Sequence, residues 1–110
     1  MEITTRTEGS ATIVAIAGSL DSNTAPAAQQ ALDAILAGGV KKLALDFTAL
    51  DYISSAGLRV MLGIAKKLGG NGGGLKLFGL NQSVREVFDI SGFSTILSVA
   101  RTEADALKGL

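Results

Sequence analysis

The sequence contains no cysteine, no histidine and no tryptophan, and it has a single proline, Pro26. Without cysteine the chain can form neither a disulfide nor a thiolate metal site, which fits a reducing compartment. Without histidine it lacks the commonest metal ligand and the commonest general base near neutral pH. We therefore expect a protein with no metal, no cofactor and no histidine-dependent catalysis.

The sequence also lacks an excess of charge and a long apolar run. Its 10 basic and 10 acidic residues cancel, so nothing indicates a nucleic-acid partner. No apolar segment approaches the length of a membrane span. The opening MEITTRTEGS has no basic stretch followed by an apolar run, as a signal peptide would. We expect a cytoplasmic protein that does not insert into a membrane, with one domain over residues 1–110.

Strand and helix patterns alternate along the chain. Apolar or threonine-rich runs predict strands at 2–8, 11–17, 43–47, 75–80 and 96–100. The order is β-β-α-β-α-β-α-β-α. Strand–helix–strand crossovers place parallel strands side by side, so the sequence predicts an α/β fold with a mixed sheet of about five strands and about four helices.

Four helices are expected from apolar spacing and from capping residues. The first, capped by Asn23 or Thr24, ends at Gly38 and buries a face of Ala28, Ala31, Leu32 and Ile35. The second runs from about 55 to 68 and buries Leu58, Met61, Leu62, Ala65 and Leu68. The third follows Asn81, although Ser83 and Glu86 offer a competing capping box. Thr102 opens the last helix.

Two features could carry chemistry at first sight. Asp21, Asp46 and Asp51 could form a carboxylate cluster if their loops meet, but such residues are also ordinary turn formers. The glycine run 69–74 leaves a helix and enters a strand, which is the wrong polarity for a phosphate-binding loop. We interpret it as a loose connection.

Ser54 and Ser55 lie where an apolar strand gives way to a helix. One hydroxyl can cap the helix, which leaves the other free to face solvent and accept a phosphoryl group. Phosphate would add about −1.5 to −2 charges, and the positive end of the helix would tolerate them. The small residues Ala56 and Gly57 could keep the helix start flat for a partner. Alternatively, both serines cap and Gly57 only packs against the sheet.

Three segments make the sequence recognisable: GSLDSNTAP, LALDFTALDYISSAGLRVML and LFGLNQSVREVFDISGF. Together they resemble the STAS domain family of anti-sigma factor antagonists (anti-anti-sigma factors) over nearly the whole chain. The resemblance implies a partner-switching protein without catalytic activity. Its unphosphorylated form would bind an anti-sigma factor that is also a serine kinase of the histidine-kinase ATPase type. Phosphorylation would release that partner, and a PP2C-type serine phosphatase would reverse the modification.

The resemblance also implies which residues act. Many relatives read D-S-S-G, whereas here Ser54 stands in the place of the aspartate and Ala56 directly precedes the glycine. Ser55 is the expected acceptor, with Ser54 as the alternative. The expected partner-binding residues are Asp21, Ser22, Asn23, Thr24, Asp46, Ser54, Ala56, Gly57 and Arg59.

Two other functions stay open. The chain could be a stand-alone STAS binding module of a transport or stress-signalling assembly that phosphorylation does not regulate. It could also be a small enzyme that uses aspartates, in which case Asp46→Asn would abolish turnover. Partner identity separates the first alternative from the switch, and turnover separates the second.

Overall fold

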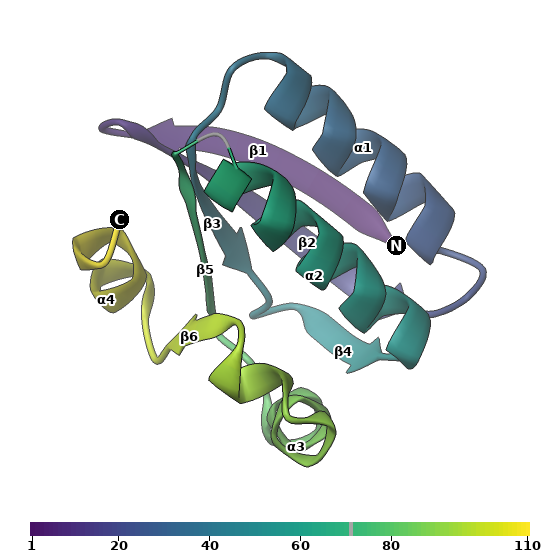
Figure 1. Cartoon of the computed structure of the whole chain (residues 1–110). Coiled ribbons are helices and arrows are strands. Elements are labelled where there is room, and N and C mark those ends of the chain that lie inside the picture. Colours follow the sequence, from purple (N-terminus) through teal and green to yellow (C-terminus); the bar gives the residue numbers. More distant parts are fainter. Residues whose placement is uncertain (71) are drawn as a thin grey trace.

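Within residues 1–70 and 72–110, which a computed structural model of the chain describes, six strands form one mixed sheet (Figure 1). The strand order is β1-β2-β3-β5-β6, and β4 pairs with β2. β1 is antiparallel to β2, and the other pairs are parallel. The strands are β1 (Glu2–Glu8), β2 (Ala11–Leu20), β3 (Lys42–Asp46), β4 (Leu50–Ile53), β5 (Gly74–Phe78) and β6 (Ser98–Ala100).

The helices pack on both faces of the sheet, and most of the core lies on one of them. They are α1 (Ala25–Ala37), α2 (Ser55–Gly70), α3 (Gln82–Ser91) and α4 (Glu103–Lys108), with a short 3₁₀ helix at Phe93–Thr95. Val14 and Ile16 of β2 pack in the large core cluster with side chains of α1, α2 and α3. Ile13, on the opposite face of β2, packs in a smaller cluster with Ala106 of α4. This alternation follows from the two-residue period of a strand.

β4 explains how the carboxyl end of β2 is held. Thr12 to Ala15 of β2 pair with β3, and Gly18 to Leu20 pair with β4. The register shifts between Gly18 and Ser19, and Gly18 has a φ of 95°, which only glycine adopts at low cost. β4 therefore extends the parallel sheet beyond the end of β3.

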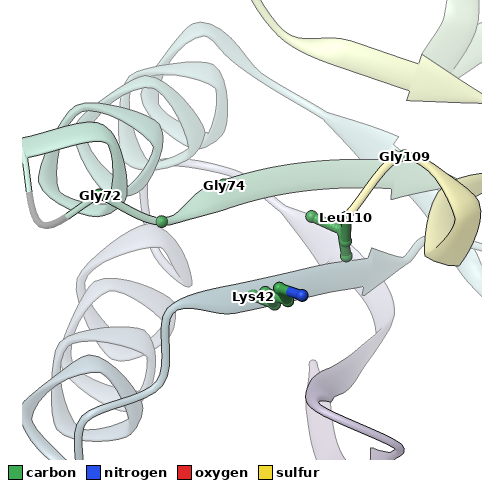
Figure 2. Close-up of a pocket in the computed structure, with 6 residues that line it drawn as sticks. Lys42, Gly72, Gly74, Gly109 and Leu110 are labelled. Atoms are coloured by element: carbon green, nitrogen blue, oxygen red, sulfur yellow. The ribbon is translucent and has the colours of Figure 1, made fainter.

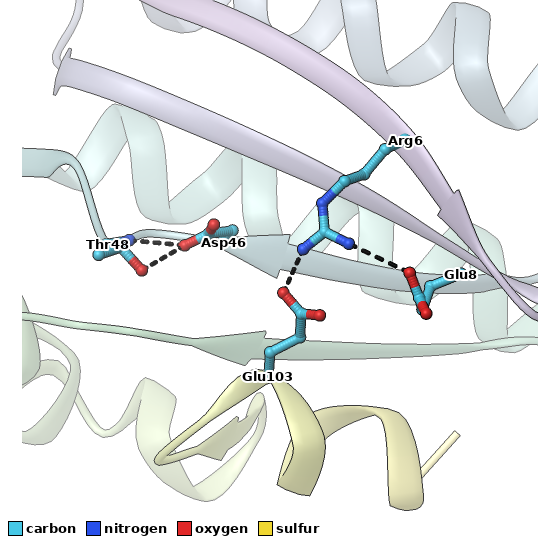
Figure 3. A network of polar contacts seen from close by, with 5 residues as sticks. All are labelled: Arg6, Glu8, Asp46, Thr48 and Glu103. Carbon is cyan, nitrogen blue, oxygen red and sulfur yellow. Dashed lines mark hydrogen bonds and ion pairs between the residues drawn. The ribbon is translucent and has the colours of Figure 1, made fainter.

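The small α4 is attached to the sheet by polar contacts as well as by its apolar side. Glu103 at its start pairs with Arg6 of β1, and Arg6 also reaches Glu8 at 3.4 Å (Figure 3). The side chain of Thr102 accepts a hydrogen bond from the amide of Asp105, as expected for the residue that opens this helix. Ala106 is fully buried. The buried Ala106, the partly buried Leu107 and the ion pair of Glu103 with Arg6 thus attach α4 to the sheet.

The predicted α/β class and mixed sheet are confirmed, with three corrections. The segment 50–53 was not among the predicted strands and is the strand β4, so the order is β-β-α-β-β-α-β-α-β-α. The second strand continues to Leu20, three residues further than predicted, because β4 pairs with its end. The expected strand 96–100 is shorter, since the 3₁₀ helix and a turn precede Ser98.

The connection expected at 69–74 is shorter than predicted. Gly69 and Gly70 belong to the last turn of α2, and Gly74 begins β5. Asn71, at the middle of this connection, lies outside the described residues. The predicted cap of the third helix is confirmed, because the side chain of Asn81 accepts a hydrogen bond from the amide of Val84 at 2.8 Å. The competing start at Ser83 is therefore not used.

Candidate functional site

The starts of α1 and α2 meet at the carboxyl ends of β2 and β4 (Figure 1). Leu20 ends β2 and pairs with Ile53, which ends β4. The next amide, that of Ser54, donates a hydrogen bond to the carbonyl oxygen of Leu20 at 2.8 Å. This bond brings two segments together, Asp21–Thr24 and Ser54–Arg59, which we call the tip.

Ser54 and Ser55 have different surroundings at the tip. Ser54 is half-buried, and its Oγ accepts a long hydrogen bond of 3.4 Å from the amide of Gly57. Its carbonyl oxygen accepts from the amide of Leu58 at 3.0 Å, so Ser54 occupies the capping position. Ser55 is the first residue of α2 and is exposed. The chain thus has one serine that caps and one whose hydroxyl faces solvent.

Gly57, which was expected to be a contact residue, is a buried member of its segment of the tip. A Cβ atom at this position would lie 2.8 Å from Cγ1 of Ile53, 3.0 Å from Cβ of Leu20 and 3.1 Å from the carbonyl oxygen of Leu20. Any side chain would push α2 away from the ends of both strands. The glycine therefore serves close packing, which was the second of the two interpretations of its sequence.

Asp21 and Thr24 hold the start of α1 by exchanging hydrogen bonds. The Oδ1 of Asp21 accepts from the amides of Asn23 and Thr24, at 2.9 and 3.0 Å, and the Oγ1 of Thr24 accepts from the amide of Asp21 at 2.9 Å. The bonds from the amides of Thr24 and Asn23 lower the pKa of Asp21 below its usual value. The predicted capping residue Thr24 is confirmed as the N-cap of α1, although its side chain makes no capping bond and the carboxylate of Asp21 instead binds the amides just before the helix.

The exposed surface of the tip comes from few side chains. Ser22, Asn23 and Ser55 are exposed, and so is Arg59, one helical turn after Ser55. Ala56 and Thr24 are half-buried. Tyr52 of β4 is 52% exposed, close in sequence to Ser55, and was not among the predicted contacts. It was missed because the segment 50–53 was not predicted to be a strand, although Tyr52-Ile53 is a pair typical of strands.

Asp46 does not lie at the tip, contrary to expectation. It pairs with Ala15 of β2, five residues before Leu20, which corresponds to roughly 16 Å along the strand. Its Oδ1 accepts hydrogen bonds from the amide (2.9 Å) and hydroxyl of Thr48, so it shapes the turn between β3 and β4 (Figure 3). Asp21 and Asp46 therefore act as turn formers, the alternative to the carboxylate cluster that was conditional on their loops meeting.

A pocket at the opposite end of β3 and β5 includes part of the glycine run (Figure 2). The lining residues are Lys42, Gly72, Gly73, Gly74, Gly109 and Leu110. The amide of Gly73 already donates to the carbonyl oxygen of Leu68 at 2.7 Å, and that of Gly74 donates to Lys41 at 2.8 Å. These amides are not free to hold an anion, which agrees with the rejection of a phosphate-binding loop.

Two further features of residues 1–70 and 72–110 bear on chemistry. In this part of the chain no three acidic residues lie close enough together to hold a metal ion. The helices described there are all too short or too polar to cross a membrane.

Comparison with known proteins identifies the family. A family model described as the STAS domain matches residues 2–106, and the chain belongs to this family. It is 44% identical over 94 residues to "Putative anti-sigma factor antagonist BtrV" of Bordetella bronchiseptica, covering 86% of this chain and 81% of that one. An anti-sigma-B factor antagonist of Listeria monocytogenes is 33% identical over 90 residues, or 82% and 79% of the two chains.

A solved structure agrees with this assignment. The crystal structure of an anti-sigma factor antagonist from Mycobacterium paratuberculosis superposes with a TM-score of 0.90 and 25% identity, over 98% of this chain and 92% of that one. The expected family is confirmed by these matches. All three relatives are named as antagonists of regulatory proteins and not as enzymes.

Proposed function

We propose that this protein is an anti-sigma factor antagonist of the cytoplasm whose tip binds an anti-sigma factor and is switched by phosphorylation of Ser55. The observation that carries the proposal is the division of roles between the two serines. Ser54 is half-buried and caps α2, whereas Ser55 is exposed at the first position of the helix. A phosphoryl group on Ser55 would alter the surface without removing the capping bond.

The partner is a serine kinase of the histidine-kinase ATPase type that doubles as the anti-sigma factor. In the transfer, Oγ of Ser55 forms a bond to the γ-phosphorus of ATP. The bond from that phosphorus to the bridging oxygen of ADP breaks, and the serine proton leaves with a base of the kinase. A PP2C-type phosphatase hydrolyses the phosphoserine. The new charge of about −1.5 to −2 on a flat surface weakens the complex.

The contact surface of the proposal consists of exposed and half-buried tip residues. The side chains displayed there are those of Ser22, Asn23, Ala56 and Arg59. The backbone that carries them is held by hydrogen bonds of Asp21, Thr24 and Ser54. We exclude Asp46 and Gly57 from this surface. Asp46 pairs with Ala15 and lies away from the tip, and Gly57 is buried.

Mass spectrometry after incubation with ATP and a lysate of the source organism tests the acceptor. The parent protein, Ser54→Ala and Ser55→Ala are compared, with a known kinase substrate as the positive control. We expect a single phosphate that is lost only in Ser55→Ala. Full phosphorylation of Ser55→Ala would assign the phosphate to Ser54 instead. No phosphate on any form would favour a constitutive STAS binding module of another assembly.

Affinity for the purified anti-sigma factor tests the switch itself. Ser55→Ala should bind like the unphosphorylated parent even in the presence of ATP. Ser55→Glu should bind less tightly while keeping the same thermal unfolding midpoint. Equal affinity of Ser55→Glu, phosphorylated parent and unphosphorylated parent would contradict a switch that works through charge.

A further inference from the structure

Arg59 lies on the same side of α2 as Ser55. They are four positions apart in the sequence, which is about one helical turn and a rise of about 6 Å. Both are exposed. Residues at this spacing are neighbours on the helix surface, and long side chains on a helix point back toward its amino end. The guanidinium of Arg59 can therefore reach toward Ser55.

Within residues 1–70 and 72–110, the side chain of Arg59 forms no ion pair. Among the residues that the structure describes, the cations found in ion pairs are Arg6, Lys67 and Arg85. The first turn of α2 contains no acidic residue. The carboxylate of Asp21 accepts hydrogen bonds from its own segment. The guanidinium is thus available in the unmodified protein.

The order of charges along the helix favours a pair once Ser55 is modified. On a helix, an anion four residues before a cation is more favourable than the reverse order. In this order the anion lies nearer the positive, amino-terminal end of the helix dipole. A phosphate offers several acceptor oxygens, and a guanidinium can meet two of them at once. The next cation on α2 is Lys66, seven residues beyond Arg59 and too far to replace it.

We infer that phosphorylated Ser55 captures Arg59 within the same helix, so that Arg59 belongs to the partner surface only while Ser55 is unmodified. This inference rests on the proposed function, because it assigns a second role to the same switch. Phosphorylation then makes two changes at once. It adds negative charge to the tip, and it withdraws a cation that the unmodified tip offers to its partner.

A stability cycle tests the pair without any kinase or partner. Phosphoserine is installed at position 55 during translation, in the parent and in Arg59→Gln, with Lys66→Gln as the matched control. The measured quantity is the change that phosphorylation makes in the folding equilibrium constant. In low salt we expect this change to favour the folded state about two- to five-fold more in the parent than in Arg59→Gln. Lys66→Gln should behave like the parent. The difference should disappear in 1 M NaCl. Equal shifts in the parent and Arg59→Gln would overturn the inference.

The ¹⁵N-labelled guanidinium of Arg59 provides a readout that needs no substitution of the arginine. Its Nε–H resonance should move when phosphoserine replaces serine at position 55, while that of Arg85 should not. An unchanged Arg59 resonance would also overturn the pair. Failure of these two measurements leaves phosphorylation of Ser55 intact as a proposal. Failure to find a phosphate in the lysate experiment leaves the pair testable, because translation supplies the phosphoserine.

Discussion

At the scale of single residues, neighbouring positions of the tip contribute differently to folding. Ser54 and Gly57 both support the start of α2. The amide of Ser54 donates to Leu20 at the end of β2 and its Oγ caps the helix, whereas Gly57 lets the helix pack closely on the strand ends because it has no side chain. Ser55 lies between them and makes neither contribution. A residue that folding does not require can be modified without loss of structure, and this is the property that an acceptor of phosphate needs.

The two serines should differ in their effect on stability. Ser54→Ala removes the oxygen that accepts the amide of Gly57, and we expect the free energy of unfolding to fall by about 0.5–1 kcal/mol, since this capping bond is long. Ser55→Ala should change it by less than about 0.5 kcal/mol. Urea denaturation measures both. A larger loss in Ser55→Ala than in Ser54→Ala would contradict the assigned roles.

Gly57 and Gly63 form a matched pair in α2. Alanine favours a helix by up to about 1 kcal/mol over glycine. At Gly57, however, the new methyl group would meet Ile53 and Leu20 at 2.8 to 3.1 Å, and we expect a net loss of about 1–3 kcal/mol. At Gly63 the nearest atom is Oε1 of Gln29 at 4.0 Å, so Gly63→Ala should stabilise. Thermal unfolding of both variants checks the contrast, which equal effects would refute.

At the scale of elements, the two helices of the tip begin in different ways. α2 begins with a single capping serine, whereas α1 begins with the reciprocal bonds of Asp21 and Thr24. The hydroxyl of Thr24 also donates to the carbonyl oxygen of Ser19 at 2.8 Å. The start of α1 is therefore tied to β2 as well as to itself.

The carboxylate of Asp21 should give α1 a stability that depends on pH. Its pKa is lowered in the folded protein, so the carboxylate stabilises the fold above its ordinary pKa of about 3.9, and this contribution is lost as pH falls through the lower folded value. We expect Asp21→Ala to melt below the parent at pH 7 and to approach it as the medium becomes more acidic than about pH 4. Ser22→Ala, an exposed control, should match the parent throughout.

Some elements of the structure could be predicted from the sequence and others could not. Helices with a buried stripe and a capping side chain were placed correctly, as α3 with Asn81 shows. β4 was missed because it has only four residues, of which Leu50 and Ile53 are buried and Asp51 and Tyr52 are exposed, so it lacks strict alternation. Its existence depends on pairing with the distant β2, which no local pattern contains.

The candidate site could be predicted only in part, because local patterns do not contain the long-range pairing of strands. Residues next to one another in sequence, such as Ser54 and Ser55, were placed together correctly. Asp46, which the family resemblance placed among the partner-binding residues, does not lie level with the carboxyl end of β2. Five residues of register separate Asp46 from that level, and β4 fills the difference.

At the scale of the whole molecule, the tip and α4 belong to different parts of the core. α1, α2 and α3 contribute to the large cluster, whereas Ala106 packs with Ile13, Ala44 and Phe78 on the opposite face. Among the described residues, the two core clusters are thus separated by the sheet. Damage to the small cluster should therefore leave the geometry of the tip unchanged.

The variant Ala106→Glu should disturb the small cluster and leave the tip unchanged. A carboxylate forced into the small cluster should displace α4 and lower the free energy of unfolding by about 1–3 kcal/mol. Binding of a fluorescent apolar dye should rise as Ile13, Ala44 and Phe78 become accessible, while amide resonances of Ser54 to Arg59 stay in place. The exposed Ala104→Glu is the control. Large shifts of the tip resonances would show that the two parts are coupled.

The division at the tip between supporting and displayed side chains has a consequence for how such proteins diversify. Asp21, Thr24 and Ser54 carry the hydrogen bonds that shape the tip, whereas Ser22, Asn23 and Arg59 are displayed on it. After a gene duplication, the displayed positions could change freely while the supporting ones kept the shape. Sister copies in one cell could then acquire separate partners without cross-talk, because recognition and foldability would be inherited through different residues.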